Sequence, residues 1–290
     1  MMYLILSIVS STGILIVFKL FKRFNIDRLQ AIVVNYIVAC LCGFIAFDGP
    51  LSIQQISQAD WFLPTAALGA LFILIFYLMA LTTQRAGLSV TSVAVKMSLV
   101  IPILFGLLFY KESANALKVI GIVLALVAVY LTSSRKEEGK QVTGASVLVL
   151  PLLVFLGSGI IDTSIKFLED SYVGEGEVPL FSSTVFGAAA SLGILFLIVG
   201  KLRGKVTFAW RNILGGIALG IPNYFSIYFL VQALRIPSLE SSTVFTINNV
   251  AIVLFSTLVG ISLFKEKLSP KNWFGILLAV VSIVLVAIAI

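Results

Sequence analysis

The chain contains no histidine, and only 11% of its 290 residues are charged. Without histidine, a serine–histidine dyad, a histidine-ligated metal site and the commonest general base are excluded. The two cysteines, Cys40 and Cys42, stand two residues apart on different faces of one apolar segment, so they indicate packing rather than a disulfide framework or a metal site. We therefore expect neither a cofactor nor a metal.

Apolar residues, in contrast, make up 60% of the chain. A helix needs about 20 mostly apolar residues to cross the hydrocarbon core of a membrane. Ten segments meet this requirement, and they are too uniformly apolar for the alternating pattern of a membrane barrel. The sequence thus predicts an all-α integral membrane protein whose surroundings are the lipid bilayer. The expected spans are Met2–Leu20, Leu29–Phe47, Trp61–Thr82, Leu88–Phe109, Ala116–Thr132, Ala145–Leu168, Leu180–Gly200, Asn212–Leu234, Ser241–Phe264 and Trp273–Ile290.

A repeat divides the chain into two halves. Residues Ala80–Leu131 match Ala233–Val286, and Tyr110-Lys111-Glu112 corresponds to Phe264-Lys265-Glu266 at a constant spacing. Internal symmetry in a very apolar chain is typical of secondary transporters, whose substrate lies between two related halves.

The expected domains are two five-helix repeats, residues 1–134 and 145–290, joined by a short charged linker. Because five is an odd number, two like halves in one chain must be inverted relative to each other across the membrane. The fold class we predict is therefore ten transmembrane helices arranged as two inverted five-helix repeats.

The basic residues orient this bundle. Fifteen of the 20 lysines and arginines fall on one side of the expected spans, four on the other, and Lys96 inside a span. Cytoplasmic loops are enriched in basic residues, so both termini are predicted to lie outside a cytoplasmic (inner) membrane. This topology also accounts for the net charge of +7, and we expect no nucleic-acid partner.

The two halves resemble the drug/metabolite transporter superfamily, specifically its EamA-type members with ten spans. The motifs that carry the resemblance close or open corresponding spans of each half, and they are Ala80-Leu81, Ala233-Leu234, Ser89–Ser92, Ser241–Thr246, Lys111-Glu112, Lys265-Glu266, Gly121 and Gly275. The resemblance covers nearly the whole chain and implies a carrier whose cavity is enclosed by helices one, three, four, six, eight and nine. It is specific for the fold and for transport but weak for the substrate. The Trp-Gly pair usual in the first span is absent, and Ser10-Ser11-Thr12-Gly13 stands there.

Lys96 is the most informative residue inside a span. It follows Leu88 by eight residues, which at a rise of ~1.5 Å places it ~12 Å into the fourth span. A lysine at the centre of a membrane helix costs roughly 2.5–3.5 kcal/mol, so it should face a cavity or a partner. Lys96 either attracts a carboxylate or phosphate of the substrate, or pairs structurally with Asp162 or with backbone carbonyls.

Asp162, near the outer end of the sixth span, could bind a substrate ammonium, carry a coupling proton or neutralise Lys96. Asn248 and Asn249 break the repeat symmetry, because the first copy has apolar residues at the matching positions. These amides indicate a site for hydroxyl or carboxylate groups, with hydrogen bonding between helices as the alternative.

Pro222-Asn223-Tyr224 is expected to interrupt the eighth span, and Pro102 to bend the fourth, because proline leaves a backbone carbonyl without its donor. Asn223 and Tyr224 are therefore candidates for the substrate site. The hydroxyl residues Ser11, Ser92 and Thr246 complete the set, although small hydroxyl residues also allow close helix packing. Glu112 and Glu266, at span ends beside lysines, are expected to pair or pack at the membrane surface.

The predicted function is a secondary carrier for a small polar metabolite, with an amino acid, an organic acid or another anionic or zwitterionic solute favoured. A sugar or nucleoside carrier stays open, because Asn and Tyr side chains suit hydroxyl groups. A multidrug exporter of lipophilic cations is disfavoured, since no acidic residue lies between Met1 and Lys22. A coupling proton is one candidate partner beside the small-molecule substrate.

Functions from other classes fit less well. A channel would need a filter-like loop or a ring of charges, and neither occurs in the sequence. An intramembrane aspartyl protease would need two aspartates within spans, whereas Asp162 is the only one. We therefore expect no enzymatic activity.

Overall fold

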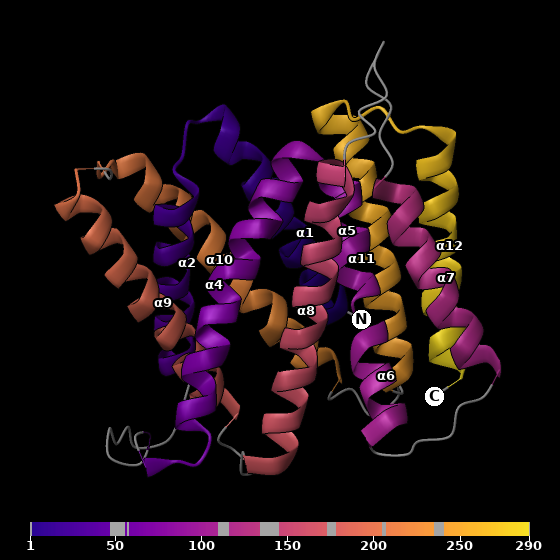
Figure 1. Ribbon diagram of the computed structural model, residues 1–290, viewed down its shortest axis with the longest axis horizontal. Coiled ribbons are helices and arrows are strands. Elements are labelled where there is room, and N and C mark those ends of the chain that lie inside the picture. Colours follow the sequence, from indigo (N-terminus) through magenta and orange to yellow (C-terminus); the bar gives the residue numbers. More distant parts are fainter. Residues whose placement is uncertain are drawn as a thin grey trace. The chain divides into compact units, whose positions relative to one another are not determined.

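A computed structural model describes residues 2–46, 56, 58–109, 116–133, 145–172, 178–204, 207–234 and 241–289. Throughout these residues every regular element is an α-helix (Figure 1). Eight of the helices are long and apolar enough to cross a membrane. They are α1 (Met2–Arg23), α2 (Arg28–Ile45), α4 (Phe62–Arg85), α8 (Ala145–Tyr172), α9 (Val178–Leu202), α10 (Trp210–Leu234), α11 (Ser241–Phe264) and α12 (Pro270–Ile288). The predicted all-helical membrane fold is confirmed.

Shorter apolar helices occupy the two remaining expected spans. The fourth expected span holds α5 (Leu88–Met97) and α6 (Val100–Phe109), and the fifth holds α7 (Ala116–Ser133). The apolar stretches of these helices fall short of the length that defines the other eight. The count of ten spans therefore stays a prediction.

The helices form two compact units. The first contains Met1–Lys19, Leu78–Ile160 and Phe225–Ile290, and the second contains Leu20–Tyr77 and Ile161–Tyr224. Each unit thus draws segments from both expected repeats, so the units do not follow the division at the charged linker. Four helices, α1, α4, α8 and α10, have residues in both units.

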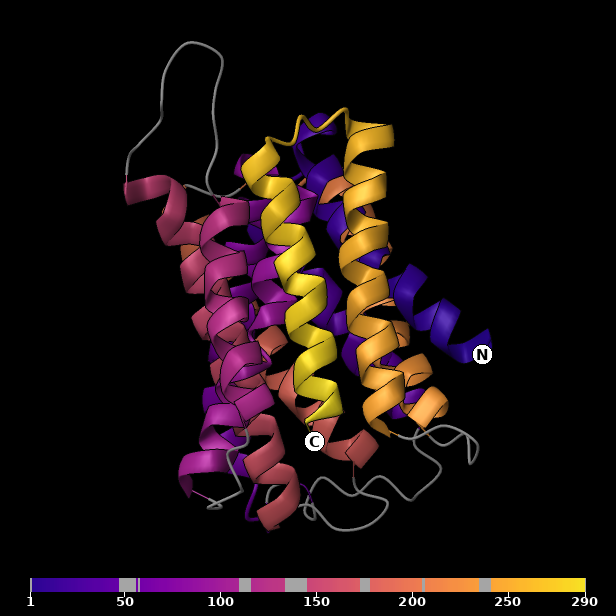
Figure 2. The same ribbon diagram turned by 90° about the vertical axis from the view of Figure 1, so that its right-hand side faces the viewer.

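In the first unit, α12 lies along α7, and α11 packs against α12 and α5 (Figure 2). Glycines bring the first pair together: a Cβ on Gly121 would lie 2.6 Å from Val286 Cγ2, and one on Gly275 would lie 2.8 Å from Thr132 Cγ2. The Ser282 hydroxyl donates to the Gly121 carbonyl at 2.7 Å. Gly121 and Gly275, noted in the sequence as repeat markers, are therefore sites of close helix contact.

In the second unit, α2 packs along α9 through small residues. A Cβ on Gly193 would meet the side chains of Val33 and Ile73, and the Cys40 thiol lies 3.4 Å from the Cβ position of Gly187. Tyr36 is fully buried, and its hydroxyl donates to the Phe72 carbonyl at 2.7 Å. Cys40 is therefore a packing residue within this unit.

Of the two expectations about proline, the one for Pro222 is corrected, and the one for Pro102 agrees with a break in the fourth span. The eighth span is not interrupted, because α10 runs unbroken through Pro222. The fourth span is broken, but at Ser98 and Leu99, four and three residues before Pro102. A proline at position 102 cannot donate to the carbonyl of residue 98, and that carbonyl instead accepts the Ile101 N–H at 2.9 Å. The position of the break therefore follows from the proline.

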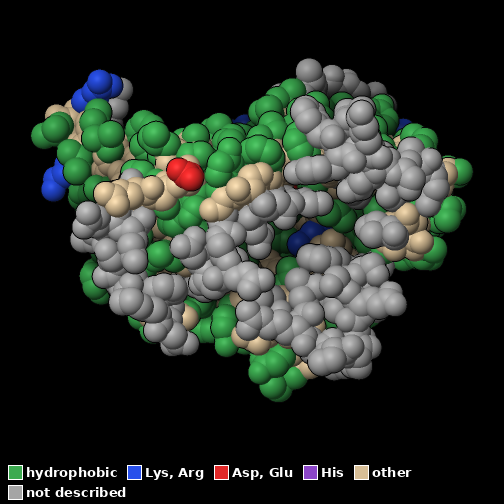
Figure 3. All heavy atoms as spheres, turned by 90° about the horizontal axis from the view of Figure 1, so that it is seen from below, with side chains coloured by type: hydrophobic (Ala, Val, Ile, Leu, Met, Phe, Trp, Pro, Cys, Tyr) green, Lys and Arg blue, Asp and Glu red, His purple; other side chains and the backbone are tan. Residues whose placement is uncertain are grey.

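Large apolar side chains are exposed on the described helices. Ile45 is 84% exposed, and Leu195 and Phe196 are more than half exposed. On the face drawn in Figure 3, hydrophobic side chains cover most of the described surface. Such a surface suits lipid rather than water, in agreement with the membrane fold.

Candidate functional site

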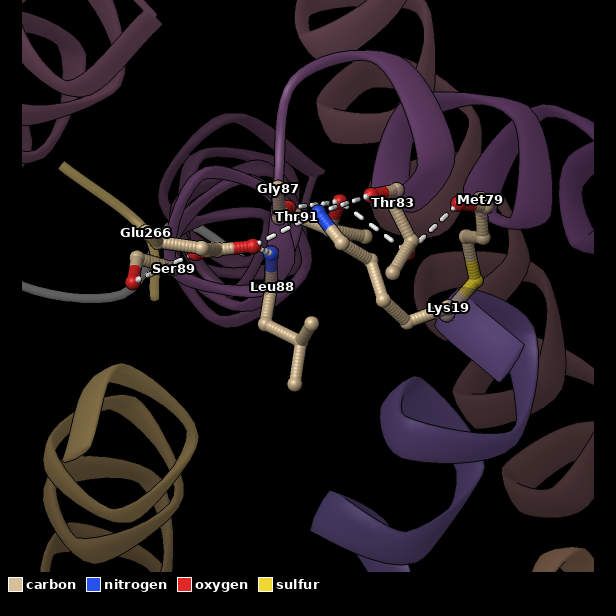
Figure 4. A network of polar contacts seen from close by, with 8 residues as sticks. All are labelled: Lys19, Met79, Thr83, Gly87, Leu88, Ser89, Thr91 and Glu266. Carbon is tan, nitrogen blue, oxygen red and sulfur yellow. Dashed lines mark hydrogen bonds and ion pairs between the residues drawn. The ribbon is translucent and has the colours of Figure 1, made fainter. Parts of the chain in front are cut away.

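The best-defined polar network in the first unit is centred on the Glu266 carboxylate (Figure 4). Lys19 Nζ lies 2.8 Å from Glu266 Oε1, and the Leu88 backbone N–H donates to the same oxygen at 2.9 Å. The Glu266 side chain is only 6% exposed and that of Lys19 only 19%. The carboxylate therefore binds a cation and caps the first turn of α5 at the same time.

Backbone conformation makes room for this carboxylate. Gly87, which precedes α5, has φ +106°, and a Cβ there would lie 2.8 Å from a Glu266 oxygen. A Cβ on Gly260 would lie 2.6 Å from Glu266 Oε2. Lys265 takes a left-handed φ of 51°, which turns the chain so that the Glu266 N–H donates to the Gly260 carbonyl at 2.9 Å. Glycine is thus required by space at both positions, and at 87 by conformation as well.

Hydroxyl groups extend the network from α5 to the end of α4. The Thr91 hydroxyl donates to the Gly87 carbonyl at 2.9 Å, and the Thr83 and Thr91 hydroxyl oxygens lie 3.2 Å apart. Thr83 also donates to the Met79 carbonyl at 2.8 Å. The start of α5 is therefore held by α1, by α4 and by the turn after α11.

Lys96 lies in the last turn of α5, and its side chain is partly buried. Two residues later the fourth span breaks at Ser98 and Leu99, and α6 begins at Val100. The Ser98 hydroxyl donates to the Val95 carbonyl at 2.6 Å and so satisfies one carbonyl that the broken helix would leave open. The structure thus places Lys96 beside an interruption of the backbone, which the sequence did not locate.

The depth of Asn248 and Asn249 follows from how α11 packs on α5. The two helices are antiparallel, because Glu266, two residues beyond the end of α11, binds the first residue of α5. Ser89 Oγ lies 3.5 Å from the Cβ position of Gly260. Counting eight residues from this contact along each helix, a distance of ~12 Å, leads to Met97, the last residue of α5, and to Ile252 of α11, and Asn249 and Asn248 come three and four residues further along α11. The two asparagines therefore lie at the depth of the break.

Both asparagines are buried, Asn248 to 1% exposure and Asn249 to 7%. Asn248 Oδ1 has no hydrogen-bond partner among the described residues, and the same holds for the buried hydroxyls of Thr12 and Thr257 in this unit. Buried polar atoms normally have a partner, which is often water or a ligand where protein supplies none. These three atoms are therefore available to bind water or a ligand.

The predicted hydroxyl residues differ in their surroundings. Ser92 is buried, and its hydroxyl donates to the Ser89 carbonyl at 3.0 Å, one turn earlier on α5. Ser11 is partly buried on α1. The Thr246 side chain and the whole of Glu112 lie outside the described residues. Of the predicted site, the first unit thus brings Lys96, Ser92 and the two asparagines onto a pair of packed helices.

The other predicted residues belong to the second unit. Asp162 is an exposed side chain of α8, and Tyr224 is partly buried on α10. Asn223 is 5% exposed, and its amide donates to Asn35 Oδ1 of α2 at 3.1 Å. Lys96 and Asp162 belong to different units, so their pairing stays a prediction.

Sequence reasoning missed three functional groups. Lys19 was counted only as a charge at a span end, although it binds Glu266; Glu266 was expected to pair or pack at the membrane surface, but Lys19 was not named as its partner. Asn35 is one amide in an apolar run, AIVVNYIVAC, and this isolation was a signal that it needs a partner. The partners of all three come from distant parts of the chain.

Residues 1–134 match the model of the EamA-like transporter family. An uncharacterized protein of Haemophilus influenzae is 28% identical over 284 residues, which cover 97% of this chain and 95% of that one. A Listeria monocytogenes protein named "Putative sugar uptake protein" is 29% identical over 231 residues, with 74% of this chain and 76% of that one covered.

A solved crystal structure aligns with 98% of this chain and 97% of its own, with a TM-score of 0.59 and 15% identity, which shows a shared fold. The family match confirms the resemblance seen in the sequence motifs, and eight apolar helices of sufficient length agree with it. Residues 1–134 are thus similar to the EamA-like transporter family, and the apolar helices are those of a multi-pass membrane protein.

Proposed function

We propose that this protein is a secondary carrier that moves a small polar metabolite across the cytoplasmic membrane by alternating access. The favoured substrates are an amino acid, an organic acid or another anionic or zwitterionic solute. The observation that carries the proposal is the break in the fourth span directly after Lys96. Carriers commonly bind substrates at discontinuous helices, where backbone groups are free to contact the solute.

The break supplies the chemistry for an anionic group. The positive end of the α6 dipole lies there, although Pro102 has no N–H and the Ile101 N–H already donates to the Ser98 carbonyl. Lys96 adds a full positive charge from α5. Asn248 and Asn249, at the same depth on α11, add neutral amides. A carboxylate or phosphate is the group that this combination of charge and N–H donors favours.

The proposed architecture is ten spans in two inverted repeats, residues 1–134 and 145–290, with both termini outside. Reciprocal contacts support it. Gly121 meets Val286, and its repeat counterpart Gly275 meets Thr132, which is the counterpart of Val286 at the same spacing of 154 residues. Two related helices that exchange equivalent contacts are what a two-fold relation between the repeats requires. Asp162 is proposed to carry a coupling proton or to bind a substrate ammonium.

Thermal stabilisation of the purified protein by a metabolite panel tests the function. A ligand that binds only the folded state raises the unfolding temperature by mass action. Carboxylates or phosphates should stabilise wild type and Lys96→Arg but not Lys96→Met. Equal stabilisation of wild type and Lys96→Met by these anions would contradict the role given to Lys96.

A sugar carrier is the second candidate. The relative named for sugar uptake favours it, and so do the neutral buried atoms Asn248 Oδ1, Thr12 Oγ1 and Thr257 Oγ1, which suit hydroxyl groups. Stabilisation by neutral sugars that is equal in wild type and Lys96→Met would select this candidate over the anion carrier.

A further inference from the structure

Two side-chain amide pairs join α2 to α10 in the second unit, and they differ in how completely their hydrogen bonds are satisfied. One pair, Gln30–Asn212, lies at the start of both helices. The other, Asn35–Asn223, lies deeper: Asn35 follows the start of α2 by seven residues, or ~10 Å, and Asn223 is near the middle of α10.

The pair at the helix starts is fully engaged. Asn212 Nδ2 donates to Gln30 Oε1 at 2.8 Å, and Gln30 Nε2 donates to the Thr207 carbonyl at 3.0 Å. Asn212 Oδ1 accepts the Asp27 backbone N–H at 3.0 Å. Every polar atom of the two side chains thus has a protein partner, as expected of amides that hold two helices together.

The mid-span pair, Asn35–Asn223, is not fully hydrogen-bonded. Asn223 Nδ2 donates to Asn35 Oδ1 at 3.1 Å, but Asn35 Nδ2 has no hydrogen-bond partner among the described residues. Asn35 is 0% exposed, and it lies on a helix that crosses the membrane. An amide N–H₂ group left without an acceptor there is costly, so helix adhesion alone does not explain this residue.

The pair cannot relax by a small shift of the helices, because glycines hold α10 close against α2. A Cβ on Gly216 would overlap Val34, and one on Gly220 would lie 2.9 Å from the Asn35 carbonyl oxygen. The two backbones are therefore in close contact over the two turns of α10 that precede Asn223. The Asn35 N–H₂ group is held in place by packing, as a binding group should be.

We propose that the Asn35 N–H₂ group binds an acceptor oxygen of the transported solute, a hydroxyl or carbonyl oxygen, and that Asn35 and Asn223 form a polar binding position on α2 and α10. The inference rests on the proposed carrier function. The Asn223 contact leaves the Asn35 Oδ1 atom occupied and directs its N–H₂ group to the ligand. A neutral donor suits a neutral oxygen, and this position is distinct from the cationic one at Lys96.

The double variant Asn35→Leu/Asn223→Leu tests the inference, with Gln30→Leu/Asn212→Leu as the matched control. A single change at Asn35 would leave Asn223 Nδ2 without its acceptor, whereas the double change removes both amides. Without added solute, the mid-span variant should melt at or above the wild-type temperature, because an unsatisfied buried group is replaced by an apolar one. The control should melt several degrees lower. A loss at mid-span as large as in the control would overturn the proposal.

Uptake into proteoliposomes gives the second readout, with D-glucose, L-threonine and succinate as probes. For each probe that wild type transports, the mid-span variant should raise KM about tenfold, the effect of losing one well-placed hydrogen bond, while the control keeps the wild-type KM. Equal KM in wild type and the mid-span variant would overturn the proposal and indicate that water satisfies Asn35. If wild type transports none of the probes, the carrier proposal fails for this panel, and melting alone decides on Asn35.

Discussion

Lys19 and Lys96 are both lysines of apolar helices in the first unit, and they differ in what surrounds them. Lys19 ends on a carboxylate at 2.8 Å, and its Nζ also lies 3.4 Å from the Thr83 carbonyl oxygen. Lys96 stands two residues before a broken backbone, at the depth of two buried asparagines. The difference teaches that a lysine in a membrane helix has a structural or a functional role according to its partner.

Removing the partner of Lys19 should have the largest effect on stability. Glu266→Ala takes away the ion pair and the cap of α5 together, and it leaves a mostly buried ammonium without its counter-ion. We expect a loss of about 3 kcal/mol in the free energy of unfolding, measured by denaturation in detergent. Glu266→Gln keeps an acceptor for the Leu88 N–H and should lose less. Equal losses in the two variants would show that the cap on α5 contributes nothing, and an unchanged stability in Glu266→Gln would show the same of the charge pair.

Changing each lysine in turn compares them directly. Lys19→Met should lower the free energy of unfolding by about 1–2 kcal/mol, because Glu266 keeps the Leu88 N–H but loses its cation. Lys96→Met should abolish binding of anionic solutes, because it removes the positive charge beside the break. Thermal melts with and without solute measure both quantities. A Lys96→Met variant as unstable as Lys19→Met would identify Lys96 as structural.

The smallest effect concerns the turn that presents Glu266. Lys265 has a left-handed φ of 51°, which glycine adopts without steric cost. Lys265→Gly should therefore raise the free energy of unfolding by up to about 1 kcal/mol. The same substitution at Lys271, an exposed residue in the first turn of α12, should lower it by a similar amount, because glycine disfavours a helix. Two changes of the same sign would contradict this explanation.

Helix positions were predictable because hydrophobicity in a membrane protein is a local signal. The expected spans Leu29–Phe47 and Leu180–Gly200 agree with α2 and α9 to within two residues at each end. The Pro222 interruption was wrong because a membrane helix tolerates proline when its neighbours pack around it, and α10 is held against α2 through Gly216 and Gly220.

The candidate site was predictable only in part. Lys96, Asn248 and Asn249 stood out because polar residues are rare in apolar spans, and that rarity is visible in the sequence alone. Asn35 gives the same signal in the sequence. Its importance, however, lies in two facts that the sequence does not contain: its Oδ1 accepts a hydrogen bond from Asn223, 188 residues away, and its Nδ2 has no partner among the described residues. No local pattern contains that information.

The sequence by itself determined that this protein lies in a membrane, that it is helical, that it contains a repeat and which family motifs it carries. Each of these depends on composition or on spacing along the chain. Only the tertiary structure decided that Glu266 caps α5 and neutralises Lys19, that the fourth span breaks beside Lys96, and that one of two amide pairs is left unsatisfied. These features depend on which side chains meet across helices, and contacts between distant segments are fixed by packing rather than by any local run of residues.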